Sequence, residues 1–341
     1  MMNPIQEAIS RLAASAEDRL ANELLTQVAD EILSGKASSP QISAFLLGIA
    51  MQGETADEIN AFVESMLTHA KQFPDLDDLE TIVDVVGTGG DGHNTFNIST
   101  TAALIAAAAG VPVAKHGNRS ASSKCGSADV LAELGFDLEQ SPELGAKQLR
   151  EHHFCFLYAR AYHASMRHAA EARQALKIRT LFNYCGPLSN PVRPSVQLVG
   201  VAKEELIQPM VQTLKRMGLR RALVVCGLDG MDEISLCQDT VGVLLDQDGS
   251  LSHWSFSPRD VGYKPCEMAD LVGGDATENA ALTKEVLGGA KGAKANAVHL
   301  NAGAVLWLAG AEATFQQGVA KARAIQESGT ALELLNTLTK V

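Results

Sequence analysis

The chain has 341 residues, of which 46% are hydrophobic and 20% are charged, and its formal net charge at pH 7 is −12. A chain of this size and composition is typical of a globular protein with one large domain and one small one. The excess of negative charge argues against a nucleic-acid-binding protein and against a protein that binds anionic membranes.

The six cysteines lie at least eleven residues apart and form no C-x-x-C pair. Neither a zinc site nor a disulfide framework is indicated, so we expect reduced thiols and a cytoplasmic location. The N-terminus has no apolar signal core, and the longest apolar run, residues 102–114, is too short to span a bilayer. The sequence therefore predicts no membrane partner.

Residues 1–72 are predicted to form a small, all-helical domain of four amphipathic helices. Ser38-Ser39-Pro40 offers a hydroxyl cap followed by proline, and Thr55-x-x-Glu58 is a capping box. Apolar residues recur at intervals of three and four along 42–49 and 59–66, as amphipathic helices require. Four short helices bury little surface alone, so we expect them to pack on something else, most naturally a second subunit in a homodimer.

After a linker near residues 71–78, strands alternate with helices over residues 80–341. This alternation predicts an α/β domain whose central sheet is mostly parallel, with helices on both faces. Asp246-Gln247-Asp248-Gly249 resembles a hairpin turn, so the sheet should be mixed. Helices around 165–190 are expected to pack on the helical domain. The predicted strands are 82–86, 111–115, 154–158, 196–201, 222–226 and 241–245, and the predicted helices are 100–109, 127–134, 143–151, 203–217, 278–287, 293–309 and 311–326.

Four glycines within Gly87-Thr88-Gly89-Gly90-Asp91-Gly92 follow the first predicted strand. Without side chains, such a loop lets backbone N–H groups approach an anion closely. The hydroxyl residues 99–101 then precede an alanine-rich helix and can cap its N-terminus. A strand, a glycine loop and a helix N-terminus in this order predict a phosphate-binding site.

Two other interpretations of these glycines are a simple tight turn and a dinucleotide-binding loop. The run does satisfy G-x-G-x-x-G. That pattern, however, requires a helix beginning within the glycines and an acidic residue about 20 positions later. Here the helix begins near Ser99 and the next strand ends in Lys115-His116, so a nicotinamide-dependent enzyme is disfavoured.

The loop after the second predicted strand, residues 115–129, is rich in cations, hydroxyls and glycine. It ends at Ser127, which is expected to cap the next helix. Because ligands of α/β proteins bind at the carboxyl ends of the strands, this loop and the glycine loop should face one crevice. Together the two loops suit a ligand with two separated phosphate groups. The alternative interpretation of residues 115–129 is a basic turn that is simply exposed to solvent.

Two further stretches carry charge in a pattern that suits a binding site. Residues 160–179 contain five Lys or Arg against one acid, Glu171, although basic helix faces are often merely solvated. Asp232-Glu233 follow the strand at 222–226, and adjacent carboxylates there are suitable ligands for Mg²⁺, which usually pairs one or two acids with substrate phosphates. Without a phosphate site beside it, an Asp-Glu pair on a loop would be interpreted as two solvent-exposed surface residues.

Seven motifs in order resemble the anthranilate phosphoribosyltransferase family, over about residues 5–330. The resemblance implies a small helical domain, an α/β domain similar to nucleoside phosphorylases, a homodimer, and the second step of tryptophan synthesis from chorismate. The motifs are Gly87-Thr88-Gly89-Gly90-Asp91, Asn97-Ile98-Ser99-Thr100, Lys115-His116-Gly117-Asn118-Arg119, Gly126-Ser127-Ala128-Asp129, Arg179-Thr180-Leu181-Phe182-Asn183, Gly186-Pro187-Leu188 and Met231-Asp232-Glu233.

The resemblance also implies which residues bind each ligand. Magnesium would involve Ser99, Asp232 and Glu233, and anthranilate would contact Gly87, Asn118 and Arg173. Phosphoribosyl pyrophosphate (PRPP) would contact Gly87, Gly90, Asp91, Thr95, Asn97, Ile98, Ser99, Thr100, Lys115, His116, Gly117, Asn118, Arg119, Ser120, Ala121, Ser122, Ser123 and Ser127.

Residue chemistry and the resemblance agree on the reaction. Displacing pyrophosphate from the ribose develops negative charge on the leaving group, which Mg²⁺ and Lys115 would stabilise. The amine of anthranilate is neutral at pH 7, so we assign no catalytic acid or base. The alternatives are a pyrimidine nucleoside phosphorylase, which would not need the Asp232-Glu233 pair, a nucleic-acid-binding relative, and a structural module.

Overall fold

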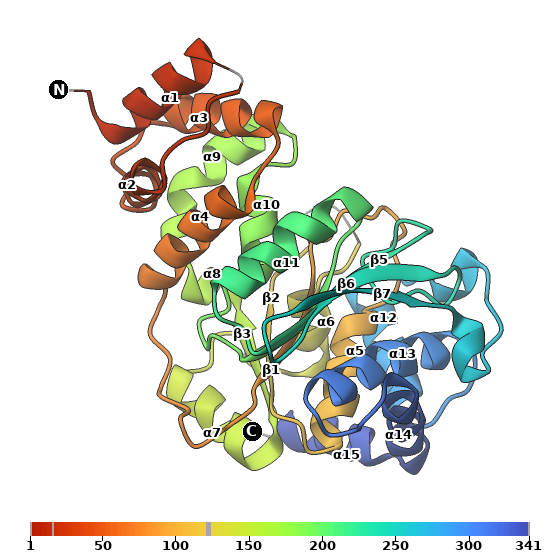
Figure 1. Ribbon diagram of the computed structural model, residues 1–341. Helices are drawn as coiled ribbons and strands as arrows, with labels where there is room; N and C mark the ends of the chain where they lie inside the picture. The colour runs from red at the N-terminus through yellow and green to blue at the C-terminus, as the bar shows by residue number, and fades with distance from the viewer. Residues whose placement is uncertain (1, 16, 121–123, 340–341) are drawn as a thin grey trace.

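The computed structural model describes residues 2–15, 17–120 and 124–339 (Figure 1). Within these residues a seven-stranded mixed sheet has the strand order β3-β2-β1-β4-β5-β6-β7. β1 to β5 are parallel, whereas β6 and β7 form an antiparallel hairpin at one edge. The predicted fold class, a helical N-terminal part followed by an α/β part with a mostly parallel sheet, is confirmed. The strands are β1 (Val83–Gly87), β2 (Val113–Gly117), β3 (Phe154–Tyr158), β4 (Val196–Gly200), β5 (Arg221–Gly227), β6 (Thr240–Leu245) and β7 (Leu251–Phe256).

The four N-terminal helices are α1 (Pro4–Ala14), α2 (Asn22–Leu33), α3 (Ser39–Gln52) and α4 (Ala56–Thr68). Their starts follow the predicted signals: Pro40 lies in the first turn of α3, and Thr55 and Glu58 form the capping box of α4. The helices pack against α9 (Arg167–Leu176), α10 (Leu181–Cys185) and α11 (Ile207–Arg216), at the upper left of Figure 1. The chain itself therefore supplies part of the packing surface that these helices need.

Two large apolar clusters, one on each face of the sheet, make up most of the core, and a smaller third cluster contains Leu149 and Leu157. One joins Val85, Leu198 and Leu223 to the helices at the lower right of Figure 1. The other is shared between the opposite sheet face, represented by Val86 and Val224, and the helices α1–α4 and α9–α11. The remaining helices are α5 (Ile98–Ala108), α6 (Ser127–Leu134), α7 (Pro142–His152), α8 (Ala159–Tyr162), α12 (Ala276–Leu287), α13 (Ala293–Leu308), α14 (Phe315–Ser328) and α15 (Thr330–Leu338).

Two predicted helix caps differ from the structure. The N-cap of α5 is Asn97, so the helix begins before the hydroxyl residues that were expected to cap it. The N-cap of α6 is Gly126 rather than Ser127, and the Asp129 carboxylate accepts a hydrogen bond from the Gly126 N–H at 2.9 Å. In both places the hydroxyl residues that were expected to cap the helix lie inside its first turn instead.

The order of the strands fixes where a ligand can bind. β1 connects through α5 to β2 on one side, whereas β4, on the other side of β1, connects through α11 to β5. The sheet therefore changes winding direction between β1 and β4, and such a switch point opens a crevice at the carboxyl ends of the strands. No helix within the described ranges is long and apolar enough to cross a bilayer.

Candidate active site

The glycine loop (residues 87–92) and the acidic loop (residues 228–239) meet at the switch point. The Gly89 N–H donates to Asp232 Oδ2 at 2.7 Å, although 143 positions separate the two residues. A Cβ atom on Gly87 would lie 2.3 Å from the Asp232 carboxylate, and one on Gly200 would lie 1.7 Å from the Asp232 carbonyl oxygen. Glycine is thus required on both β1 and β4 for the acidic loop to approach.

The start of α5 is joined to the same acidic loop. The Ser99 N–H donates to Glu233 Oε1 at 3.1 Å, so the carboxylate lies at the positive end of the helix dipole. Lys115, on β2, is only 2% exposed and donates through Nζ to the Val85 carbonyl at 2.6 Å and to Ser99 Oγ at 3.4 Å. A buried ammonium group, a helix N-terminus and a carboxylate therefore converge at one place.

Burial and mutual repulsion raise the pKa of both loop carboxyls. The pKa of Asp232 rises to about 7, mainly by burial and by the nearby Asp91, and that of Glu233 rises to about 8, mainly by burial and by Asp232. Burial lowers the pKa of Lys115, although Asp84 and Glu233 oppose this effect. Asp232 and Glu233 therefore lie in surroundings that disfavour their charged forms, and a bound cation would stabilise those forms.

These residues fit a magnesium ion that is shared with a substrate. The carboxylates and the Ser99 hydroxyl are hard oxygen donors, which Mg²⁺ prefers. In the part of the chain that the structure describes, no three His, Cys, Asp or Glu side chains gather as a complete metal site. Mg²⁺ is usually bound by one or two carboxylates together with substrate phosphates and water, so Asp232 and Glu233 would be enough on the protein side.

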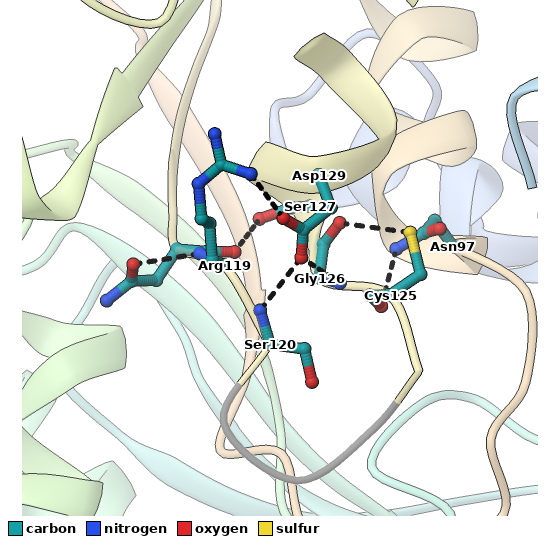
Figure 2. A network of polar contacts seen from close by, with 8 residues as sticks. Asn97, Arg119, Ser120, Cys125, Gly126, Ser127 and Asp129 are labelled. Atoms are coloured by element: carbon teal, nitrogen blue, oxygen red, sulfur yellow. Dashed lines mark hydrogen bonds and ion pairs between the residues drawn. The ribbon is translucent and has the colours of Figure 1, made fainter. Parts of the chain in front are cut away.

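The loop after β2 is braced by Asp129, as Figure 2 shows. Its carboxylate accepts hydrogen bonds from Arg119 Nη1 at 2.8 Å, from the Ser120 N–H at 3.0 Å and from the Gly126 N–H. The Ser127 hydroxyl lies 3.4 Å from the Asn118 carbonyl oxygen. The loop is therefore shaped around one carboxylate, which offsets part of the Arg119 charge. Ala121, Ser122 and Ser123 lie outside the described residues.

The other predicted PRPP residues lie on or beside the same edge. Asn97 donates to the Cys125 carbonyl at 3.4 Å and accepts from Asn279, which ties the start of α5 to the loop after β2. Thr95 forms a bridge with Val272, and both Ile98 and Thr100 are buried. The structure thus brings most of the predicted phosphate-binding segments together.

His116 is placed differently from a phosphate-binding cation. Its ring is buried against His163, with the ring centroids 5.3 Å apart. Burial lowers its pKa to about 3, so the ring is neutral at physiological pH. The adjacent Gly117 must stay small, because a Cβ atom there would lie 2.1 Å from Ser127 Oγ. The backbone of this segment, rather than the imidazole, is therefore available to the crevice.

Arg173, the predicted anthranilate residue, lies near the end of α9. Its guanidinium stacks over the Phe182 ring at 5.7 Å, and its pKa is lowered by burial. Among the described residues its side chain has no hydrogen-bond or ion-pair partner, which is unusual for a partly buried arginine. These features suit an anionic ligand such as an aromatic carboxylate.

Arg179 emerges as a site residue that the sequence pattern alone did not assign. Its guanidinium donates to the carbonyls of Gly89 at 2.8 Å and of Thr88 at 3.4 Å, and it lies 5.8 Å from the Tyr184 ring. A Cβ atom on Gly90 would lie 2.4 Å from Arg179 Nη1. The sequence signals were the basic stretch and the family motif that contain it, and neither could show that it contacts the glycine loop.

Two buried polar residues that sequence reasoning missed hold the site in place. Asp84 accepts hydrogen bonds from the His116 N–H at 3.1 Å and from Asn190 at 2.9 Å. Asn301, on α13, accepts from the Ile234 N–H at 3.0 Å and donates to the Ile234 carbonyl at 3.1 Å. Asn301 thereby fixes the backbone directly after the Asp232-Glu233 pair.

Comparison with known proteins identifies the family to which the chain is similar. Residues 6–70 match the helical bundle domain of the glycosyl transferase family, and residues 79–332 match its a/b domain. The chain is 46% identical over 331 residues to the anthranilate phosphoribosyltransferase of Methanobrevibacter smithii, covering 97% of each chain. It is 44% identical to that of Shewanella baltica, covering 99% of this chain and 96% of the relative.

Solved structures give the same result. The Thermus thermophilus anthranilate phosphoribosyltransferase superposes with a TM-score of 0.90 at 39% identity, covering 99% of this chain and 98% of the other. A Saccharomyces cerevisiae anthranilate phosphoribosyltransferase in complex with PRPP and Mg superposes with a TM-score of 0.89 at 26% identity, covering 98% and 96%. The chain described here belongs to the anthranilate phosphoribosyltransferase family.

Proposed function

We propose that the protein transfers the 5-phosphoribosyl group of PRPP to the amine of anthranilate, giving N-(5-phosphoribosyl)anthranilate and pyrophosphate in a Mg²⁺-dependent reaction. One observation carries the proposal. The acidic loop binds both the glycine loop, through Gly89–Asp232, and the start of α5, through Ser99–Glu233. The acidic side chains that would hold Mg²⁺ therefore lie beside the loop that would bind phosphate. Relatives that cover nearly the whole chain are named for this reaction, and the yeast structure contains PRPP and Mg.

PRPP would lie across the carboxyl ends of β1 and β2. The residues that we propose for it are those predicted from the sequence, with Arg179 added as a brace of the glycine loop. Ser99, Asp232 and Glu233 would hold Mg²⁺, which, when bound, neutralises charge that develops on pyrophosphate. The buried side chain of Lys115 would place a second positive charge beside the same leaving group.

The chain's own contribution to the reaction is mainly positioning and charge. Because the attacking amine is neutral at pH 7, no side chain has to remove its proton before attack. The glycine loop and the N-terminus of α5 would orient the phosphates, and Arg173 would orient the carboxylate of anthranilate. Holding both substrates in line lowers the barrier by replacing a bimolecular encounter with a unimolecular step.

The assay that tests this proposal follows the fluorescence of anthranilate. We expect the signal to fall when PRPP and Mg²⁺ are both added to the protein, and pyrophosphate to be released in equal amount. Omitting either PRPP or Mg²⁺ should leave the fluorescence unchanged. A protein that releases no pyrophosphate under any of these conditions would rule out the proposed reaction.

Substituting Arg173 should weaken anthranilate binding selectively. A planar guanidinium can donate two parallel hydrogen bonds to a carboxylate, so Arg173→Lys, which keeps the charge but loses the fork, should not behave as a conservative change. A charge-assisted hydrogen bond contributes about 1.5–3 kcal/mol. We therefore expect the KM for anthranilate to rise about ten- to a hundredfold, at about 1.4 kcal/mol per decade, with little change in the KM for PRPP. Steady-state kinetics with each substrate varied in turn provide the measurement.

Arg167→Lys is a matched control, because Arg167 starts the same helix and is exposed. It should leave both KM values unchanged. If Arg173→Lys and Arg173→Ala affect PRPP and anthranilate equally, or do not affect anthranilate at all, the carboxylate is bound elsewhere.

We also propose that the protein is a homodimer joined through its N-terminal helices, and that residues 1–72 form a domain with helices around 165–190. Leu47 and Met51 lie one turn apart on α3 and are 42% and 80% exposed, next to a face already packed on α1 and α9. An exposed apolar pair on a short helical unit suits contact with a second subunit.

Introducing charge at this pair should dissociate the dimer. We expect the double variant Leu47→Glu/Met51→Glu to sediment as a monomer at micromolar concentration, where the unmodified protein sediments as a dimer. Ala320→Glu/Ala324→Glu is the matched control, because these alanines are also exposed and one turn apart, on α14. A monomeric unmodified protein, or a variant that stays dimeric, would contradict the proposed interface.

A further inference from the structure

Two cysteine side chains lie against each other beside the acidic loop. The Sγ atoms of Cys237 and Cys266 are 3.3 Å apart, a distance shorter than ordinary contact between two sulfur atoms and longer than a disulfide. All six cysteines lie within the described residues, and all six are free thiols there. Cys237 is almost buried, whereas Cys266 is partly exposed.

The pair can be reached from solvent. Cys237 and Cys266 both line a cavity of about 480 Å³. Its wall also contains His93, Asp229 and Arg259, which are polar or charged. A small polar thiol or disulfide compound can therefore approach the sulfur atoms without unfolding the protein.

The two cysteines belong to segments that shape the proposed metal site. Cys237 lies four positions after Glu233, and its N–H donates to Ser235 Oγ, which in turn donates to Asp229 within the same acidic loop. A bond to Cys237 would therefore act on the loop that carries both proposed metal-binding acids.

Cys266 belongs to a segment that pairs with residues 94–95, directly after the glycine loop. Its own N–H already donates to the Leu236 carbonyl at 3.3 Å, and six residues later the chain pairs with the segment after the glycine loop. There Val272 forms a bridge with Thr95, and the Gly273 N–H donates to the Asn94 carbonyl at 2.9 Å. A covalent link between the two sulfur atoms would join the acidic loop to the segment that pairs with the residues after the glycine loop.

We propose that Cys237 and Cys266 form a reversible disulfide site, oxidised by small-molecule disulfides such as oxidised glutathione, and that the bond weakens the Mg²⁺ response of the enzyme. The effect on Mg²⁺ rests on the function proposed above, whereas formation of the bond does not. In the reducing cytosol such disulfides are rare, and those that do form are usually transient and regulatory.

The chemistry of bond formation follows from the geometry. The Cys266 thiolate attacks the small disulfide, forms a mixed disulfide and releases one thiol; Cys237 then displaces the second thiol and closes the protein disulfide. Two electrons and two protons pass from the protein to the small disulfide, which becomes two thiols. Burial raises the pKa of both cysteines, while the hydrogen bond from Cys237 favours the Cys266 thiolate, so oxidation should be faster at pH 9 than at pH 7.

The first test measures the bond itself. The purified full-length protein is incubated with oxidised glutathione, the reagent is removed, and free thiols are counted after denaturation. We expect four thiols per chain in place of six. Proteolysis before aspartate residues separates Cys226 from Cys237, and mass spectrometry should then show segment 232–238 linked to segment 260–269.

The second test measures the consequence. We expect the oxidised protein to need at least three times more Mg²⁺ for half-maximal transferase activity, and dithiothreitol to restore the original requirement. Cys237→Ser and Cys266→Ser should keep basal activity but lose the response to oxidation. Cys226→Ser, which removes one thiol and leaves the pair intact, should respond as the unmodified protein does.

Each outcome decides a separate point. If six thiols persist, or the linked segments are absent, the pair is not a disulfide site. If the bond forms but the Mg²⁺ requirement is unchanged in the active enzyme, the coupling to the metal site is wrong. If the reduced protein has no transferase activity, the proposed function fails, while the thiol count and the linked peptides still decide whether the disulfide forms.

Discussion

Replacing Lys115 with methionine should lower kcat for phosphoribosyl transfer about 100- to 1,000-fold, the usual effect of removing one charge-stabilising group from a transition state. The reason is geometric. Lys115 Nζ lies against Ser99 at the start of α5, and its charge acts on Glu233, so it is next to the place where pyrophosphate would leave. Methionine has a similar shape but no charge. Initial rates at saturating PRPP, anthranilate and Mg²⁺ measure the effect.

The Lys115 variant needs two controls. Lys321→Met makes the same change on the exposed side of α14 and should leave kcat unchanged. Because the variant also loses the hydrogen bond to the Val85 carbonyl, which should cost about 1–3 kcal/mol of unfolding free energy, its rates must be measured well below its melting temperature. A folded variant with an unchanged kcat would remove Lys115 from the leaving-group site.

Neutralising both loop acids, as Asp232→Asn/Glu233→Gln, should raise the Mg²⁺ concentration for half-maximal activity at least about 100-fold. Even residues that only support metal ligands change metal affinity about 10- to 100-fold, and here the proposed ligands themselves lose their charge. The amide oxygens can still accept hydrogen bonds from Gly89 and Ser99, so the loop should keep its position. A Mg²⁺ titration of the initial rate is the measurement.

Stability should respond in the opposite direction to activity. The pKa values of the two acids are raised because burial and nearby carboxylates disfavour their charged forms, so removing the charges relieves repulsion in the metal-free protein. We expect the melting temperature to stay the same or to rise. Asp239→Asn, an exposed carboxyl in the same loop, should change neither property. An unchanged Mg²⁺ requirement in the double variant would show that the metal is bound elsewhere.

Local sequence patterns predicted most of the strands and the N-terminal helices. The buried strands β1 to β6 and the N-terminal helices have strong periodicity and clear turn or capping residues, and all of them are present. β7 was missed because its residues at 252, 253 and 255 are exposed, as befits an edge strand, so no apolar alternation marks it. The short helix α8, and α15 after Gly329, also gave no signal strong enough to predict them.

The contacts between distant segments could not be predicted from spacing. Gly89 and Asp232 were each singled out in the sequence, but only the folded sheet shows that they share a hydrogen bond. Asn301 looks like any polar residue of an amphipathic helix, yet it is fully buried and holds the acidic loop. Local patterns identify binding groups, whereas their mutual geometry depends on the order of the strands.

The apolar cluster that contains Val86, Val224 and residues of the N-terminal helices limits which parts of the chain can be exchanged with a related protein. The helical bundle domain ends at residue 70 and the a/b domain begins at residue 79, yet side chains from both domains fill one continuous interior. A helical bundle taken from a relative would arrive with side chains shaped for a different sheet surface. Recombination at this boundary should therefore succeed only when the bundle is exchanged together with the residues of the sheet face and of α9, α10 and α11 that share its apolar cluster.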